Sequence, residues 1–581
     1  MVGSVLVVCG LLFGSLGVVP QGRAEAPFRV VFGVRTPMRD GVSLSSDIWV
    51  PTKPGRYPAL LVRTPYIKAG GDVANLVTPL AKFYVEHGYV VVIQDTRGRG
   101  DSEGKFDFFF TEGHDGYDTI EWMAAQPWSN GEVGMLGVSY LGVVQWLAAR
   151  EHPPHLVCIA PSASAGRWLE ELPYQGGAFE LAWAIDWLNA VSDRSGQGTN
   201  AAGLNMKEIL KHRPLLTVDE AFGRRMPLYR QFLQHGTMDE YWKRIQFTAE
   251  DFKNLDIPAL TTTGWFDAGQ PGALFYWSSM RAYSPARDKQ YLLVGPWTHI
   301  QTFAGGERKL GGFEFSADSV YDLKALDLAF FDHFLKGSSS KFGFPRARIY
   351  VTGTNTWRDE SEYPPAAAKN RALYLHSGGH ANTLDGDGRL SWESAKREQP
   401  DHYTYVPEDP VTPAEGEEPG LDQRDIERRK DLLVYTSDLL EQPVEIIGRI
   451  FVHLSAASDA RDTDFTARLL DVYPDGRALR LGSRDVGIIR ARYRNSLEHT
   501  ELIMPGKTEE YRIELYDIAH AFLPGHRIRV EISSSYAPVF NPNSNTGNPV
   551  ATDMQSRPAE QTIFHDGSTG SYIDLPVMPT R

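Results

Sequence analysis

The chain has 581 residues, 42% of them hydrophobic, so it exceeds one ordinary domain and can supply more than one core. Its 59 basic and 73 acidic residues give a net charge of −14, and it lacks the Lys and Arg clusters that bind phosphates. This composition argues against a nucleic-acid or anionic-membrane partner and favours a small-molecule or short-peptide ligand in a protein of two or three domains.

The first 26 residues are similar to a secretory signal peptide. An apolar stretch at 5–19 precedes Ala24-Glu25-Ala26, which fits the rule for signal-peptidase cleavage. We therefore expect a secreted or periplasmic protein, although the missing Lys or Arg before the apolar stretch leaves a cytoplasmic location open. The stretch is too short and glycine-rich for a transmembrane helix. Since Cys9 lies inside it, a cleaved chain would keep only Cys158 and form no intrachain disulfide.

The next segments predict a layered α/β domain with an insertion. Over 27–166, β-favouring runs such as 59–62 and 89–93 alternate with helical stretches such as 77–86, the pattern of a parallel sheet covered by helices. Residues 167–255 lose this strand pattern and become helical and aromatic. We expect them to form a helical cap, after which the sheet resumes over 256–340.

The last 240 or so residues follow a different pattern, which begins after a Gly- and Ser-rich linker at 336–340. Short alternating runs predict an antiparallel β-sandwich over 341–581. These runs lie at 346–351, 371–375, 444–454, 465–472, 511–516 and 527–533.

One turn in the first domain carries the pattern of a nucleophile elbow. An apolar run at 133–136 leads into Gly137-Val138-Ser139-Tyr140-Leu141-Gly142, and a helical stretch follows. In such an elbow a serine sits on a strained turn between strand and helix, and small residues allow the two backbones to approach closely. The second glycine stands one position later than in G-x-S-x-G, because Leu141 occupies the usual site.

Candidate partners for Ser139 occur in the chain order Ser, acid, His that an α/β-hydrolase requires. Asp267 and His299 each come directly after a β-favouring run, at 257–263 and 291–294. Imidazole titrates near neutrality and can take the proton of a hydroxyl, and a buried carboxylate orients the ring. Taken singly, Asp267 could cap a helix and His299 could be an ordinary loop histidine. The order, the strand ends and the elbow together favour catalysis.

These motifs resemble the cocaine esterase, α-amino-acid ester hydrolase and X-prolyl dipeptidyl peptidase group of serine hydrolases, and the resemblance covers nearly the whole mature chain. The motifs that carry it lie at 38–41, 60–66, 95–98, 115–122, 137–142, 264–267, 295–299, 462–465 and 524–530. The resemblance implies an α/β-hydrolase domain with an inserted helical cap, followed by a C-terminal all-β jelly-roll domain. In that group the elbow glycine also stands at the later position.

The resemblance also implies an oxyanion hole, formed by the Tyr66 hydroxyl and the backbone N–H of Tyr140. Such donors are typically worth about 3 kcal/mol each to the transition state. Without the resemblance, Tyr66 would be interpreted as a buried aromatic. Bulky rings at helical spacing are more often core than binding pocket. We nevertheless expect the substrate pocket to draw on the large aromatic residues of the cap and of the strand before Asp267, namely Trp168, Trp183, Trp187, Trp265 and Phe266.

Several other motifs do not support a second function. The segment 98–104 spaces its glycines wrongly for a dinucleotide fingerprint, and the Arg-Gly-Asp tripeptide inside it arises often by chance. His152-Pro153-Pro154-His155 lacks the Glu and the spacing of a zinc site. Asp462 and Asp464 could hold calcium, but alternating acids at a strand start are more often merely exposed. No cofactor and no metal is expected.

The sequence therefore predicts a serine hydrolase that cleaves carboxylic ester or amide bonds through a covalent acyl-enzyme. Asp267 is followed by Ala268, Gly269 and Gln270, where amino-ester hydrolases of the group carry acidic residues, so an uncharged acyl group is favoured. An X-prolyl dipeptidyl peptidase, an α-amino-acid ester hydrolase or a β-lactam acylase is the alternative. Non-enzymatic alternatives are a carbohydrate-binding role for the sandwich and a binding protein on a hydrolase scaffold. The sequence leaves open whether identical subunits associate.

Overall fold

The computed structural model describes residues 26–195, 205–337, 342–394, 396–413, 419–483, 486–566 and 570–579. The expected signal peptide lies outside these residues, except for Ala26, and so does most of the expected linker. In this part of the chain no helix combines the length and the hydrophobicity needed to cross a bilayer.

The first domain is built around a ten-stranded sheet with the order β1-β2-β4-β3-β5-β6-β9-β10-β13-β14. Strands β3 to β6, β9, β10 and β13 run parallel, whereas β1, β2 and β14 pair antiparallel at the two edges. The strands are β1 (Phe28–Pro37), β2 (Ser43–Pro51), β3 (Tyr57–Thr64), β4 (Val90–Asp95), β5 (Ser129–Val138), β6 (Leu156–Ser162), β9 (Ala259–Phe266), β10 (Gln290–Thr298), β13 (Ala347–Val351) and β14 (Thr356–Glu360).

Helices cover this sheet, as the alternating pattern predicted, and its central strands are buried almost throughout. The helices are α1 (Gly71–Glu86), α2 (Glu112–Ala124), α3 (Tyr140–Arg150), α10 (Gln270–Tyr283), α11 (Gln301–Ala304) and α12 (Leu323–Leu335). A small hairpin of β11 (Lys309–Leu310) and β12 (Phe313–Glu314) follows α11.

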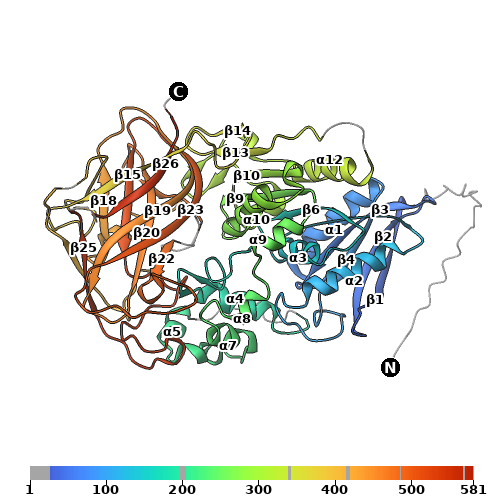
Figure 1. Cartoon of the computed structure of the whole chain (residues 1–581), viewed down its shortest axis with the longest axis horizontal. Helices are drawn as coiled ribbons and strands as arrows, with labels where there is room; N and C mark the ends of the chain where they lie inside the picture. The colour runs from blue at the N-terminus through green and yellow to red at the C-terminus, as the bar shows by residue number, and fades with distance from the viewer. Residues whose placement is uncertain are drawn as a thin grey trace, which may run out of the picture.

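The segment between β6 and β9 folds as a mainly helical insertion that lies along the seam between the two large domains (Figure 1). It also contains a short hairpin that the sequence pattern did not predict. Its elements are β7 (Tyr174–Gln175), β8 (Ala178–Phe179), α4 (Leu181–Val191), α5 (Met206–Lys211), α6 (Val218–Ala221), α7 (Pro227–Gln234), α8 (Glu240–Lys243) and α9 (Ala249–Asn254). Buried apolar side chains of this cap, such as Trp168, Phe232 and Trp242, belong to one core cluster with side chains of the sheet.

The C-terminal domain is a sandwich whose described strands pair antiparallel, except for β16 and β18, which pair parallel. Its strands are β15 (Lys369–His376), β16 (Arg389–Ser391), β17 (Asp401–Tyr405), β18 (Leu433–Ser437), β19 (Val444–Ser458), β20 (Asp464–Val472), β21 (Ala478–Arg480), β22 (Gly487–Arg490), β23 (Glu509–Phe522), β24 (Arg527–Ser533), β25 (Ala559–Phe564) and β26 (Tyr572–Val577). Strands β20 and β24 are buried on both faces, where Arg468 pairs with Glu531 at 2.8 Å.

One strand belongs to a different domain from the one expected. The run at 346–351 was assigned to the sandwich, but the structure places it in the first sheet as β13, parallel to β10. The alternating pattern of this run resembles that of the sandwich strands. Only its long-range pairing with Leu292, Leu293 and Val294 decides its sheet.

Candidate active site

Ser139 lies at the sharp turn between β5 and α3. Its φ of 64° is in the left-handed region, which is rare for a residue with a side chain. The turn is fixed by three backbone hydrogen bonds. The Ser139 N–H donates to Ser162 O at 3.0 Å, and Ser139 O accepts from the Gly142 N–H at 2.8 Å and from the Val143 N–H at 3.0 Å. The structure therefore supplies the strained, half-buried serine that the elbow motif predicts.

The late glycine of the motif has a steric cause. A Cβ at Gly142 would lie 2.3 Å from Ser164 Oγ and 2.6 Å from Ser162 O, because α3 passes directly over the end of β6. A Cβ at Gly137 would lie 2.5 Å from the Cβ of Leu141. Leu141 thus packs over one glycine, while the close approach of helix and strand requires the other.

Asp267 and His299 meet at the carboxyl ends of the neighbouring strands β9 and β10. His299 Nδ1 donates to Asp267 Oδ1 at 2.6 Å. The carboxylate is fully buried, and it also accepts hydrogen bonds from Gly269 N at 2.8 Å and Thr263 Oγ1 at 2.7 Å. The imidazole keeps one third of its side chain exposed. The acid is therefore held by three hydrogen bonds in the core, while part of the ring remains exposed.

Sequence reasoning did not single out Thr263 or the Gly269 amide. Thr263 stands in β9 four residues before Asp267, and its hydroxyl reaches the carboxylate because the chain turns back after Phe266. Neither residue belongs to a motif that marks it, so no local signal could have identified them.

Tyr66 is a half-buried residue in the loop after β3, and its hydroxyl interacts with two residues of the site. The Trp187 Nε1–H donates to Tyr66 Oη at 3.0 Å, and the Ser139 side chain also interacts with this hydroxyl. Burial raises the pKa of Tyr66, although the hydrogen bonds to Trp187 and Ser139 partly offset the rise. The phenol therefore stays protonated near neutral pH and can act as a hydrogen-bond donor.

Tyr140 is the first residue of α3, so its backbone N–H belongs to the first helical turn and has no intrahelical acceptor. Its side chain points into the core, where the hydroxyl lies within hydrogen-bond distance of Glu112 Oε1 at 2.9 Å and of Phe108 O at 2.8 Å and can donate its one proton to either. Glu112 in turn pairs with the buried Arg63 at 2.6 Å. The helix start beside Ser139 is thus anchored through the Tyr140 ring, and the amide remains available to a ligand.

The five aromatic residues expected in a substrate pocket do not lie together. Trp183 and Trp187 are half-buried on α4 and stack with ring centroids 5.3 Å apart, close to Tyr66. Trp168 is buried in the cap core and stacks on Trp242.

Trp265 and Phe266 belong to the core toward the sandwich, which corrects their expected place in the pocket. The Trp265 indole donates to Tyr350 O at 2.6 Å, and Phe266 packs on Phe313 and Phe315. Both side chains are almost fully buried. Their closeness to Asp267 in sequence does not bring them to the site, because both side chains pack in a core cluster that the first domain shares with the sandwich.

The two candidate calcium ligands form ion pairs with arginines. Asp462 pairs with Arg492 at 2.8 Å, and Asp464 forms two 2.8 Å bonds with Arg490. All four side chains are buried. Across the parts of the chain that the structure describes, no group of three or more His, Cys, Asp or Glu side chains is arranged to hold a metal ion.

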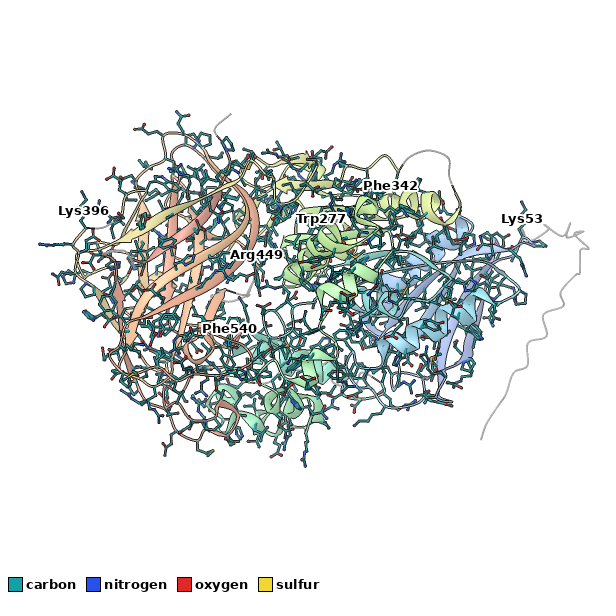
Figure 2. All side chains as sticks on the ribbon, viewed as in Figure 1. Lys53, Trp277, Phe342, Lys396, Arg449 and Phe540 are labelled. Carbon is teal, nitrogen blue, oxygen red and sulfur yellow. The ribbon has the colours of Figure 1, made fainter. Side chains whose placement is uncertain are left out.

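The sandwich contacts the loop that carries Asp267. Gln270 Nε2 donates to Asp517 O at 2.9 Å, and the Asp517 N–H donates to Gln270 Oε1 at 3.1 Å. Arg449, which lies on the sandwich edge that faces the first domain (Figure 2), pairs with Asp517 at 3.0 Å. Arg167 of the cap binds both carboxylate oxygens of Glu514 at 2.6 and 3.0 Å. The Gln270 side chain is therefore used for domain contact.

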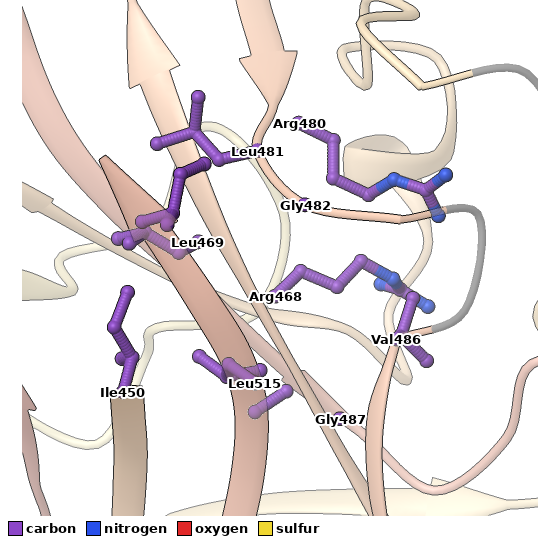
Figure 3. Close-up of a pocket in the computed structure, with 11 residues that line it drawn as sticks. Ile450, Arg468, Leu469, Arg480, Leu481, Gly482, Val486, Gly487 and Leu515 are labelled. Carbon is purple, nitrogen blue, oxygen red and sulfur yellow. The ribbon is translucent and has the colours of Figure 1, made fainter. Parts of the chain in front are cut away.

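Two hollows lie in the sandwich, away from Ser139. One, of about 20 Å³, lies among Ile450, Leu469, Leu481 and the neighbouring arginines Arg468 and Arg480 (Figure 3), and it has room for about one water molecule. The other is an open groove of about 620 Å³, and Tyr473 is the one aromatic residue among the described residues that line it.

Comparison with known proteins gives similarity along the whole chain. The family model described as X-Pro dipeptidyl-peptidase (S15 family) matches residues 40–301, and that of the X-Pro dipeptidyl-peptidase C-terminal non-catalytic domain matches residues 342–574. Cocaine esterase of Rhodococcus sp. (strain MB1 Bresler) is 36% identical, over 95% of this chain and 99% of the relative.

Two solved structures share the architecture. An α-amino acid ester hydrolase is 26% identical with a TM-score of 0.84, covering 97% of this chain and 100% of the other. An aminopeptidase from a marine sediment archaeon, Thaumarchaeota archaeon, is 25% identical with a TM-score of 0.85, covering 97% of this chain and 99% of the other.

Proposed function

We propose a serine esterase mechanism for this chain, on the premise that it belongs to the family of serine hydrolases that contains cocaine esterase and the X-Pro dipeptidyl-peptidases. Members of this family are hydrolases, and this chain is an enzyme that cleaves ester or amide bonds. The observation that carries the mechanism is the elbow serine at the end of β5, in the same parallel sheet whose strands β9 and β10 end at the 2.6 Å Asp267–His299 hydrogen bond.

In the proposed reaction Ser139 Oγ attacks the substrate carbonyl carbon while His299 takes the hydroxyl proton. Asp267 orients the ring and stabilises the imidazolium through Nδ1–H. The Tyr66 hydroxyl and the Tyr140 amide donate to the oxyanion of the tetrahedral intermediate. His299 then protonates the leaving alcohol, and an acyl-serine remains. Water, deprotonated by His299, attacks this ester and releases the acid and free Ser139.

We propose an uncharged acyl group as the preferred substrate part. Recognition of an α-ammonium group requires a carboxylate that is not already paired, because desolvating the amine must be offset by an ion pair. Around the Asp267 loop the described carboxylates have partners: Glu514 binds Arg167, and Asp517 binds Arg449. Glu171, buried nearby, accepts hydrogen bonds from three backbone amides. The aromatic pair on α4 suits a bulky or aromatic acyl or alcohol part.

The main alternative is cleavage of an X-prolyl or amino-acyl amide or ester, including acylation of β-lactams. The family descriptions and the solved aminopeptidase and α-amino acid ester hydrolase favour it. It requires the amine to find an acidic partner on entering the site, for example by displacing one of the ion pairs just described.

We propose a structural role for the sandwich. Its apolar residues share one core cluster with Trp265, Phe266 and Leu274 of the first domain, and Gln270 is hydrogen-bonded to its strand β23. A carbohydrate-binding surface would need a row of exposed aromatic rings, and among the described residues that line the groove above, Tyr473 is the single aromatic one.

We also propose that residues 1–26 direct export. The apolar stretch at 5–19 and the Ala24-Glu25-Ala26 site support cleavage after Ala26. Expression of the full chain followed by N-terminal sequencing of the secreted protein tests this proposal, and recovery of an intact Met1 would contradict it.

The test of function compares an ester with an amide. Wild type and Ser139→Ala are assayed on p-nitrophenyl butyrate and on glycyl-prolyl p-nitroanilide. Hydrolysis of the butyrate by the wild type alone, with the anilide untouched, supports the esterase. Cleavage of the anilide would instead support a dipeptidyl peptidase. Undiminished hydrolysis by a folded Ser139→Ala would overturn the nucleophile assignment.

A further inference from the structure

The cap helix α4 reaches the proposed oxyanion hole through one hydrogen bond. Indole is a donor only, so in the 3.0 Å contact between Trp187 Nε1 and Tyr66 Oη the phenol oxygen must accept. A phenol that accepts in this way keeps its own proton for another partner. Since hydrogen bonds in series polarise one another, the Tyr66 O–H also becomes a stronger donor.

A buried arginine fixes the same helix to the loop of Tyr66. Arg99 is fully buried, and its guanidinium donates to three backbone carbonyls: Pro65 O at 2.6 Å, Val191 O at 2.8 Å and Ala190 O at 3.0 Å. Pro65 directly precedes Tyr66, while the other two carbonyls end α4. Desolvation lowers the pKa of Arg99 to about 10, so the side chain remains cationic at neutral pH.

These contacts also account for the glycine-rich segment 98–104, which fits neither a nucleotide-binding loop nor an adhesion motif. Its Gly100 N–H donates to Arg194 O at 2.6 Å, just beyond α4, and its Ser102 hydroxyl bonds to Asp95 O at the end of β4. The segment thus connects the sheet to the cap on the side where Tyr66 lies.

We infer that the cap completes the oxyanion hole: Trp187 is a positioning residue that orients the Tyr66 hydroxyl toward the substrate carbonyl oxygen, and Arg99 holds α4 and the Tyr66 loop in register. This inference rests on the proposed function, since it assigns Tyr66 the role of oxyanion donor. The inference gives Trp187 two separate roles: its ring can line the substrate site, and its N–H hydrogen-bonds to Tyr66.

The test removes the N–H and keeps an aromatic ring, with Trp187→Phe assayed on p-nitrophenyl butyrate. Loss of one hydrogen bond that acts in the transition state should lower kcat about tenfold, whereas KM should change less than about threefold. The matched control is Trp242→Phe, which removes another indole hydrogen bond of the cap, to His235 O at 2.6 Å. It should leave kcat close to that of the wild type. Thermal unfolding of both variants checks that they are folded.

A double-mutant cycle with Tyr66→Phe distinguishes positioning from packing. If Trp187 acts through the Tyr66 hydroxyl, Trp187→Phe should cause little further loss of kcat once that hydroxyl is gone. Phenylboronic acid, which forms a tetrahedral adduct with a nucleophilic serine, should bind more weakly to Trp187→Phe by about the same factor as kcat falls. An additive loss in the cycle, or unchanged kcat and boronate affinity in Trp187→Phe, would overturn the inference.

Failure of the inference can be told from failure of the proposed function. If Ser139→Ala is inactive and Tyr66→Phe is impaired while Trp187→Phe is normal, the esterase mechanism stands and the role of the cap is refuted. If Tyr66→Phe keeps the full kcat, Tyr66 is not an oxyanion donor and the inference is refuted with it. If Ser139→Ala retains activity, the proposed function itself is wrong.

Discussion

Substitution of Gly142 by alanine tests how closely α3 must approach β6 for the elbow to work. The added Cβ would lie 2.6 Å from Ser162 O, a backbone atom that also accepts the Ser139 N–H. An ordinary contact begins at 3.4 Å, so helix and strand must separate by about 0.8 Å. The second close neighbour, Ser164 Oγ at 2.3 Å, can rotate away, but the carbonyl of a paired strand cannot.

Because Ser139 stands at this junction, the separation moves the nucleophile itself. A misplacement of about 1 Å can cost a factor of about 100 in rate, and overpacking typically costs about 1–3 kcal/mol of stability. We expect Gly142→Ala to lose about 100-fold in kcat/KM on p-nitrophenyl butyrate and to melt at a lower temperature. Gly343→Ala is the matched control, since its Cβ meets nothing within 4 Å.

Two outcomes would refute the proposed steric role of Gly142. If Gly142→Ala keeps kcat/KM within about twofold of the wild type, the close approach is not needed, and the steric account of the shifted glycine is wrong. If Gly343→Ala loses as much kcat/KM as Gly142→Ala, the loss of activity comes from replacing any glycine by alanine and not from the contact at Gly142.

Two further predictions concern the carboxylates around the site. Asp267→Asn removes the negative charge and replaces one carboxylate oxygen by an NH2 donor, which can impose the wrong tautomer on the His299 ring. We expect kcat to fall by about 10⁴ while far-UV circular dichroism stays unchanged; a fall below tenfold would contradict the orienting role. Burial raises the pKa of Glu171 from 4.5 to about 7, so the folded protein binds this proton more tightly than the unfolded chain. Its contribution to the unfolding free energy should therefore decrease as pH rises from about 4.5 to 7 and stay constant above. The urea midpoint of the wild type, measured relative to Glu171→Gln, should fall between pH 5 and 7.5, and a constant difference would disprove this pH dependence.

The sequence predicted the features that depend on local pattern. Alternating apolar runs identified the parallel strands, and the residues directly after them identified Ser139, Asp267 and His299 as candidates at one edge of the sheet. The insertion between β6 and β9 was recognisable because strand periodicity disappears there. The fold class is confirmed by the family matches and by the structure. The catalytic roles stay predictions.

Other features depend on which distant segments meet, and only the tertiary structure decided them. The alternation of apolar residues in β13 is the same whether the strand joins the first sheet or the sandwich. Likewise, the sequence pattern of Asp462 and Asp464 at a strand start does not show whether they bind calcium or arginine. Nothing near Trp187 in the sequence indicates that its N–H reaches Tyr66, and nothing near Gln270 indicates its contact with Asp517. Hydrophobic periodicity and turn-forming residues act over a few positions, so the sequence alone is enough to predict the elements that depend on them. Partners far apart along the chain are chosen by packing of the whole molecule, which no local pattern encodes.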